Sequence, residues 1–407
     1  MPGFSPYNLP RSSMNPTILA HVALGFAPLI DRQRLCTATR LTVMPLRPDA
    51  QLDANELLAA VTEVWPVGGA TVILNVRSES LLQALLALPV PNHVLLELPA
   101  FMAADSAHRE MLLAMKQRGN RLLLNGCPAQ PLTAELQACF KYAIFDPQDE
   151  HHSGTTGAHS LARLHAGLRN AQDIEASFVG GAVGVIGWPM QGPYEPPAGV
   201  VKRELQTDLQ VIVELMSRVD QGEDVERLEQ TLKRDPSLAF KLLRYLNSAA
   251  FGLPVEVASF RHAIMLLGYS RMKRWLALLL TTASKDHSMR PIMFAALRRG
   301  ILMEELAKSA SDASLADEMF ICGLFSLLDH MLQQPFSQLL SAIPVPDRVH
   351  QALNDASGPY QPYLELVRAI EEESVYDYRS AAEQLMLDAS EINHCVMRAL
   401  AKAAQLE

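Results

Sequence analysis

The chain has few cysteines and no closely spaced pair among them. The five are spread along the whole sequence: Cys36, Cys127, Cys139, Cys322 and Cys395. An odd number of widely separated cysteines argues against a disulfide framework, and the absence of a Cys-x-x-Cys pair argues against a zinc site. We therefore predict a reduced, cytoplasmic protein without a bound metal.

The chain also lacks an excess of positive charge and a long apolar run. It has 35 Lys and Arg against 44 Asp and Glu, a net charge of −9, so no overall field attracts nucleic acid. Its apolar stretches are interrupted by charge or proline, which predicts no membrane insertion. The opening "MPGFSPYNLPRSSMNP" lacks the features of a signal peptide, and residues 1–18 are predicted to be a flexible N-terminus.

The 407 residues, 49% of them apolar, are enough for two domains. Four nearly all-apolar segments are typical of strands buried on both faces: "TVILNV" (71–76), "HVLLEL" (93–98), "RLLLNG" (121–126) and "YAIFD" (142–146). Residues 103–119 between two of them are typical of one capped helix. Strands that alternate with helices predict parallel pairing, in a doubly wound sheet or a barrel.

The Gly- and Pro-rich tract "GWPMQGPYEPPAG" (187–199) predicts a domain boundary. Almost every later segment has apolar residues at helical spacing, as in "LQTDLQVIVELMSRV" (205–219). The predicted fold class is therefore α/β plus all-α, with a strand-rich domain at 19–197 and a helical domain at 202–407.

The stretch "DPSLAFKLLRYLNSAAFG…VASFRHAIMLLGYSRMKRW" carries the most specific pattern in the chain. It resembles the core of the HDOD domain, D-P-x-L, then L-x-x-x-N-S-A, then A-I-x-x-L-G. The matching residues, which we interpret as structural, include Asp235, Pro236, Asn247, Ser248 and Gly268. The resemblance implies a fold like that of the HD-type phosphohydrolases without their metal ligands, in a module that contacts other proteins.

The segment "CGLFSLLDH" (322–330) bears on that loss of ligands. Related hydrolases carry a His-Asp pair at the positions of Ser326 and Leu327, and neither residue replaces such ligands. Asp329 and His330 follow in the reverse order, and we interpret them as an ordinary helix surface rather than a functional pair.

The strand-rich half resembles a second family once its polar residues are placed in order. "PLIDRQRLCTATRLTVMP", "TVILNVRSESL", "VLLELPA", "YAIFD" and "MQGPYEPP" are similar to successive segments of an EAL domain fused to HDOD. The resemblance implies a (β/α) barrel and, in active members, hydrolysis of cyclic di-GMP with two divalent metals. The short interval between Asp146 and Gln191 leaves open whether the barrel has its full set of strands.

Most of the ligands implied by this resemblance are missing. The signature Glu falls on or near Thr39, Asn125 and Gly126 replace an Asp pair, and Ile144 replaces a Lys. The polar residues that remain are Asn75, Glu97, Asp146 and Gln191. A two-metal site needs several carboxylates to offset its charge, so we do not expect hydrolysis.

Ligand binding without turnover is one interpretation of the polar residues that remain. Arg40 and Arg77 are the candidates for holding a phosphate, and Asn75, Glu97 and Gln191 for contacting a guanine or ribose. The alternative, which we favour, is that these side chains form hydrogen bonds within the strand ends.

Three further polar runs have no pattern typical of a catalytic site. The basic "SRMKRW", with Arg271, Lys273 and Arg274, is typical of a solvated helix face. "EEES" (371–374) fits a helix start or an acidic docking patch. His151 and His152 fit a flexible surface loop, because their surroundings match no phosphate-loop pattern.

Together the resemblances imply a catalytically inactive bacterial signalling adaptor that contacts protein partners and has no cofactor. Its place would be the cyclic di-GMP-related regulation of motility, biofilm formation or virulence. The alternatives are a cyclic di-GMP receptor, or a residual phosphodiesterase with Mg²⁺ or Mn²⁺ on Glu97 and Asp146.

Overall fold

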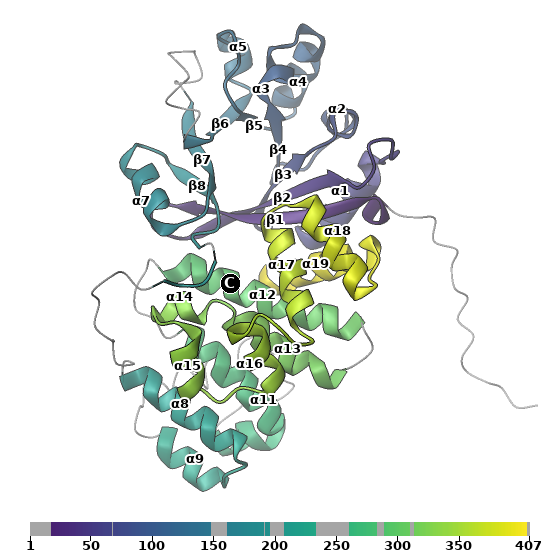
Figure 1. Cartoon of the computed structure of the whole chain (residues 1–407). Coiled ribbons are helices and arrows are strands. Elements are labelled where there is room, and N and C mark those ends of the chain that lie inside the picture. The colour runs from purple at the N-terminus through teal and green to yellow at the C-terminus, as the bar shows by residue number, and fades with distance from the viewer. Residues whose placement is uncertain are drawn as a thin grey trace, which may run out of the picture.

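The computed structural model describes residues 18–66, 68–147, 161–190, 192–195, 207–232, 260–282, 289–309 and 313–404. A strand-rich half lies above a helical half in Figure 1, and two long strands run between them. Gln191, His151 and His152 lie outside the described residues, as do four residues of the HDOD pattern, Asp235, Pro236, Asn247 and Ser248.

The strand-rich half is a closed barrel of eight strands in sequential order. They are β1 (Val22–Asp31), β2 (Cys36–Pro45), β3 (Thr71–Val76), β4 (Val94–Pro99), β5 (Leu122–Asn125), β6 (Phe140–Phe145), β7 (Ala162–Leu168) and β8 (Gly184–Gly187). The four apolar segments are confirmed as β3, β4, β5 and β6, with small shifts at their ends. The barrel therefore closes despite the short interval after Asp146.

The expected parallel pairing is confirmed from β2 to β8, whereas β1 runs antiparallel to both β2 and β8. Only residues 32–35 separate β1 from β2. A parallel crossover needs about a dozen residues or more, so this link permits only an antiparallel pair. Asp31 Oδ1 accepts hydrogen bonds from the backbone N–H groups of Gln33 and Leu35, at 2.8 and 2.9 Å, and so shapes the turn.

Helices surround the barrel at α1 (Ala54–Val64), α2 (Glu79–Ala87), α3 (Ala100–Ala104), α4 (Arg109–Gln117), α5 (Ala134–Gln137) and α7 (Ala171–Val179). The single helix predicted at 103–119 is wrong, because the chain breaks at Asp105 into α3, a 3-10 turn at Ser106–His108, and α4. Asp105 accepts from the N–H of Ala107, as residues that begin a helical turn do.

The helical half is confirmed. Its described helices are α8 (Thr207–Asp220), α9 (Val225–Leu232), α11 (Phe260–Thr282), α12 (Arg290–Ser309), α13 (Ala313–Phe325), α14 (Leu328–Leu332), α15 (Phe336–Ala342), α16 (Asp347–Asn354), α17 (Gln361–Glu371), α18 (Val375–Leu385) and α19 (Ala389–Ala404). Gly268 has φ 72° and kinks α11.

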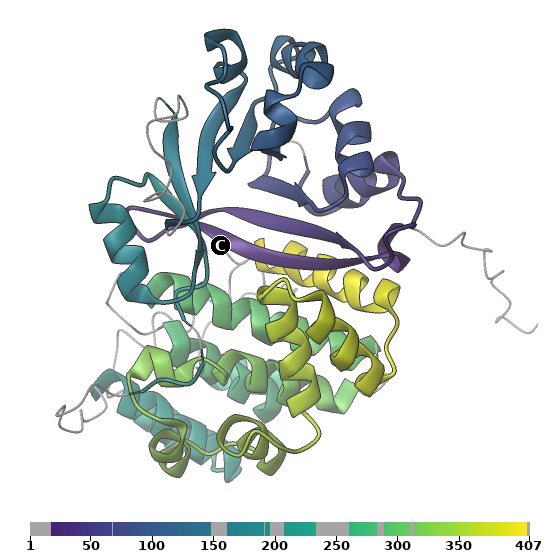
Figure 2. The same cartoon turned by 45° about the horizontal axis from the view of Figure 1, so that its top comes forward.

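The C-terminal helices complete one edge of the barrel. β1 pairs with β2 along its length but with β8 only at Leu29–Asp31, so the other edge of its first half faces no strand among the described residues. Asn393 of α19 takes that place: its Oδ1 accepts from Leu24 N at 3.1 Å, and its Nδ2 donates to Leu19 O and Val22 O at 2.8 and 2.7 Å. Figure 2 shows α18 and α19, in yellow, beneath the purple strands. Barrel and helices thus share one hydrophobic core, and the division at 197 and 202 stays a prediction.

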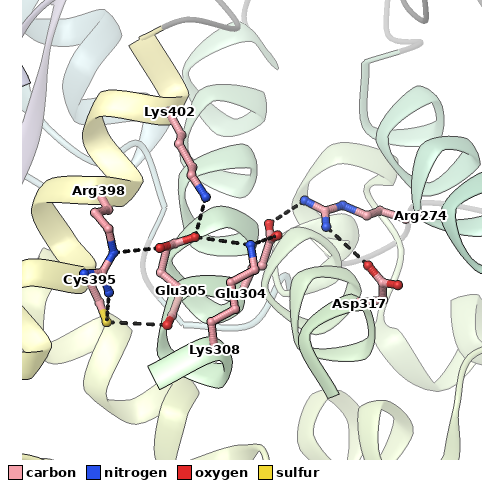
Figure 3. Close-up of polar contacts among 8 residues, drawn as sticks. All are labelled: Arg274, Glu304, Glu305, Lys308, Asp317, Cys395, Arg398 and Lys402. Carbon is pink, nitrogen blue, oxygen red and sulfur yellow. Dashed lines mark hydrogen bonds and ion pairs between the residues drawn. The ribbon is translucent and has the colours of Figure 1, made fainter. Parts of the chain in front are cut away.

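An ion-pair cluster joins α11, α12, α13 and α19 (Figure 3). Arg274 of the basic run pairs with Glu304 and Asp317, and the nearly buried Glu305 pairs with Lys308, Arg398 and Lys402. Lys273 pairs with Asp220. Two cations of the basic run therefore hold helices together.

The cluster makes stability depend on pH. Burial raises the pKa of Glu305, but the hydrogen bonds from Lys402 and Arg398 outweigh it and the pKa is lowered overall from its ordinary 4.5. A lowered pKa in the folded state stabilises the protein above pH 4.5, and this contribution is lost as pH falls through the folded-state value. We expect urea unfolding to show a steeper acid loss of stability in the wild type than in Glu305→Gln. Equal slopes would contradict this assignment.

Candidate functional site

Polar side chains gather where β2, β3 and β4 lie side by side. Thr42 is level with Asn75, and Asn75 is level with Glu97. Residues that are level in parallel strands face the same side, and Arg40, two residues before Thr42, shares that face. The resemblance put the signature Glu on or near Thr39, but Arg40 is the residue that reaches the surviving carboxylate.

Arg40 and Glu97 form a bidentate ion pair. Arg40 Nε donates to Glu97 Oε2 at 2.8 Å, and Arg40 Nη2 donates to Oε1 at 2.7 Å. Glu97 is 1% exposed, and Asn125 Nδ2 also donates to its Oε1. Burial by itself lowers the pKa of Arg40, but Glu97 and then Glu373 raise it overall. Both oxygens of Glu97 are therefore already bound to donors of the chain.

Glu373 reaches the same group of residues from the helical half. It lies between α17 and α18 and accepts from Thr42 Oγ1 at 2.6 Å, from Arg40 Nη1 at 3.2 Å and from Arg77 Nη2 at 2.9 Å. Its φ of 56° is in the left-handed region, which is costly for a residue other than glycine. Glu373 thus places a carboxylate on the two arginines predicted to hold a phosphate.

A second buried ion pair lies in the helical half. Arg299 of α12 donates through Nε and Nη2 to Glu371, at 2.9 and 2.6 Å, and through Nη1 to Ser326 Oγ at 3.0 Å. Ser326 Oγ donates in turn to Gly323 O at 2.7 Å. Ser326, which the resemblance to HD-type hydrolases aligns with a His, is therefore bonded to an arginine. The "EEES" run is a docking patch within the chain: Glu371 holds Arg299, and Glu373 holds Arg40.

The interpretation of Asp329 and His330 as helix surface is wrong for Asp329, which is 1% exposed. Its Oδ2 accepts from Tyr194 N at 2.8 Å, and its Oδ1 accepts from His330 N at 2.8 Å. His330 Nε2 lies 2.8 Å from Gly192 O. Asp329 and His330 thus bind the segment that follows the barrel, and this contact explains why the Asp329 side chain is buried.

A cavity of about 920 Å³ lies between the two halves. Its wall includes residues of both ion-pair systems and the aromatic side chains of Trp188, Tyr194 and Phe336. Five arginines line it: Arg40, Arg77, Arg169, Arg299 and Arg368.

Of the other predicted residues, Asn75 belongs to the group of Thr42 and Glu97. Asn75 Nδ2 donates to Thr42 Oγ1 at 3.2 Å, within the strand ends. Asp146 is exposed just after β6, and Gln191 lies outside the described residues. Within the described ranges, no group of three or more His, Cys, Asp or Glu side chains is placed to hold a metal ion. Ligand contacts by these residues stay a prediction.

Sequence reasoning missed Thr42 and Arg299, and it noted Glu371 and Glu373 only as part of an acidic run. The only signal for the glutamates is the acidic run itself, because their partners are far away in the chain. Arg40 and Glu373, for example, are 333 positions apart.

Residues 205–340 match the family model described as the HDOD domain. The chain contains an HDOD domain. The match ends within α15, so Glu371, Glu373 and Asn393 lie beyond the matched residues. No described helix is long and apolar enough to cross a membrane.

Two curated proteins are similar to parts of the chain. "Uncharacterized protein YuxH" of Bacillus subtilis (strain 168) is 31% identical over 211 residues, 51% of each chain. "Cyclic di-GMP phosphodiesterase CdgJ" of Vibrio cholerae serotype O1 is 26% identical over 179 residues, 44% of this chain and 41% of that protein. The matches thus span about half or less of the relatives' length.

Among solved structures, the PaMucR phosphodiesterase in complex with c-di-GMP gives a TM-score of 0.30 at 13% identity, over 42% of this chain and 92% of that one. The FimX EAL domain gives 0.28 at 12% identity, over 44% and 96%. The Bacillus subtilis YkuI protein, with an EAL domain in complex with c-di-GMP and calcium, gives 0.30 at 10%, over 61% and 73%. TM-scores this low carry no argument about the fold. The closed barrel is assigned from the strand pairing of this chain itself.

Proposed function

We propose that this chain is a bacterial signalling adaptor in cyclic di-GMP-related regulation, with an EAL-like barrel that does not hydrolyse the nucleotide. The observation that carries the proposal is the bidentate pairing of Glu97 with Arg40. The HDOD domain and the name of the Vibrio cholerae relative support the signalling context. Cytoplasmic location, and an effect on motility, biofilm formation or virulence, belong to the same proposal.

The residues present do not fit a two-metal centre. Arg40 lies against Glu97, where a bound divalent ion would face a fixed guanidinium charge. Asn75 is bonded to Thr42, and Asn125 donates its amide N–H to Glu97 rather than offering a carboxylate. This group of residues therefore offers no basis for a metal-dependent step.

We propose that the chain signals through contacts with partner proteins. The acidic run binds the helical half to the barrel through Glu373, and α19 binds the edge of β1 through Asn393. Any partner that prefers one arrangement of the two halves would shift this equilibrium, because binding energy that differs between states changes their populations.

A hydrolysis assay tests the proposal that the barrel does not hydrolyse cyclic di-GMP. Purified chain with cyclic di-GMP and Mg²⁺ or Mn²⁺ is expected to give no linear dinucleotide above the level of Glu97→Ala. Turnover by the wild type that is lost in Glu97→Ala would contradict the proposal and support the residual phosphodiesterase. Saturable nucleotide binding without turnover would instead identify a receptor.

A further inference from the structure

A second cavity lies at the opposite end of the barrel. Glu97 and Asn125 of the ion-pair group are near the carboxyl ends of β4 and β5. The second cavity, of about 420 Å³, lies at the amino ends of the parallel strands, where Thr71 begins β3 and Gly184 begins β8. Neither Arg40 nor Glu97 is part of its wall. Catalysis in (β/α) barrels belongs to the carboxyl ends of the strands, so this cavity lies outside the usual place for it.

The wall of this second cavity is mainly aliphatic. Five strands contribute large aliphatic side chains to it: Leu29, Ile73, Leu95, Leu123 and Leu164. Such layers normally fill the interior of a barrel, but β2 and β8 contribute only Ala38 and Gly184. A Cβ on Gly184 would lie 3.0 Å from Leu164 Cδ2 and 3.1 Å from Leu29 Cδ1. The two small residues therefore leave space beside the aliphatic wall.

Three side chains of the same wall carry hydrogen-bond donors. They are the ammonium of Lys141 and the hydroxyls of Thr71 and Tyr142. Lys141 precedes Tyr142 in β6, and its Nζ lies 5.2 Å from the centroid of the Tyr142 ring, which places the ammonium beside the cavity. Within the part of the chain that the structure describes, none of these three groups forms a hydrogen bond or an ion pair. All three can therefore donate to an anionic group of a ligand.

The other polar side chains of the wall are bound within the chain. Asp31 Oδ1 accepts from the backbone N–H groups of Gln33 and Leu35, and so belongs to the turn after β1. Thr37 Oγ1 donates to a backbone carbonyl of β1 at 3.3 Å. β7 and β8 stand between β6 and β1 in the barrel, which keeps the charge of Lys141 apart from that of Asp31. The wall thus offers an aliphatic surface with one cation available to a ligand.

We propose that the amino end of the barrel binds a small aliphatic carboxylate. The chain of the ligand lies among the aliphatic side chains, where its removal from water drives binding, and its carboxylate accepts from Lys141, Thr71 and Tyr142. The volume of about 420 Å³ is in the range of small-molecule sites. This site does not rest on the absence of hydrolysis, because Arg40 and Glu97 lie outside its wall.

The test is calorimetric titration of the full chain with octanoate, with acetate and octylamine as matched probes. We expect saturable one-to-one binding of octanoate. Acetate lacks the aliphatic chain and is expected to bind at least about tenfold more weakly. Octylamine keeps the chain but carries the opposite charge, and it is also expected to bind more weakly than octanoate.

Three variants locate the ligand. Lys141→Gln is expected to weaken octanoate binding about fivefold, the effect of one ion pair at an exposed position. Arg121→Gln is the matched control, because Arg121 is exposed and precedes β5 at the same end of the barrel, but is not part of the described wall. Ala38→Leu is expected to abolish octanoate binding, because the larger side chain occupies the space beside the wall.

A second readout follows the unfolding temperature. Octanoate is expected to raise it in the wild type and to leave it unchanged in Ala38→Leu. No saturable heat in the wild type, octylamine binding as tight as that of octanoate, or equal weakening by Arg121→Gln and Lys141→Gln would each overturn the proposal. If Ala38→Leu does not fold, the comparison of probes and Lys141→Gln still decide it. The hydrolysis assay is a separate measurement, so the two proposals fail independently.

Discussion

Replacement of Arg299 with methionine is expected to lower the free energy of unfolding by about 3–5 kcal/mol, the cost of leaving a buried charge without its partner. The side chains of Arg299 and Glu371 are 9% and 3% exposed. Without the guanidinium, Glu371 loses its two-pronged partner and Ser326 Oγ loses a donor. Urea unfolding followed by circular dichroism measures the change.

A double variant distinguishes this cause from lost packing. Arg299→Met combined with Glu371→Met removes both charges and is expected to recover much of the loss, because an apolar pair of similar volume often replaces a buried ion pair without cost. Arg121→Met provides the surface control. If the double variant is less stable than the single one, the uncompensated charge is not the cause.

Replacement of Arg40 with methionine is expected to cost a similar amount, about 3–5 kcal/mol. It removes the bidentate partner of Glu97, which is 1% exposed, and one of three donors to Glu373. The contact between barrel and helical half weakens at the same time. Chemical unfolding of Arg40→Met should therefore show a lower midpoint than that of the wild type. A second transition is expected if the barrel and the helical half then unfold separately.

Adding Glu97→Gln to Arg40→Met supplies the control, because it removes the charge left behind and should restore part of the lost stability. Glu373→Gln alone should cost less, since it leaves the bond between Arg40 and Glu97 in place. Equal losses for Arg40→Met and Glu373→Gln would show that the interdomain contact, rather than the charge of Glu97, carries the energy.

The apolar runs predict β3 to β6 because a strand buried on both faces needs few polar residues, and such runs are visible in one sequence. The antiparallel β1 was not predicted from the alternation, although the shortness of the turn after Asp31 contains the information. Closure of the barrel could not be predicted, because it depends on the pairing of β1 with β8, which are distant in the chain.

The candidate site was predicted in part. Glu97 and Arg40 were named from the sequence, with hydrogen bonds within the strand ends as the favoured interpretation over ligand contacts, but their pairing with each other was not predicted. Which charges meet depends on register and on the docking of α17, and neither is encoded in local spacing. The acidic run was noticed as a docking patch, but its targets lie in another element for Glu371 and in the other half for Glu373.

The same chemistry occurs in both halves of the molecule. Arg40 binds Glu97 in the barrel, and Arg299 binds Ser326 where related hydrolases are expected to carry a metal ligand. The acidic run 371–373 contacts both arginines. In both places the arginine satisfies buried acceptors.

Titration of the purified chain with Mn²⁺, followed by calorimetry, tests the central claim most directly. Because Arg40 already binds both oxygens of Glu97, the account predicts that the wild type and Glu97→Ala give the same heats, without a stoichiometric site in the barrel. Stoichiometric Mn²⁺ binding by the wild type that is abolished in Glu97→Ala would contradict it.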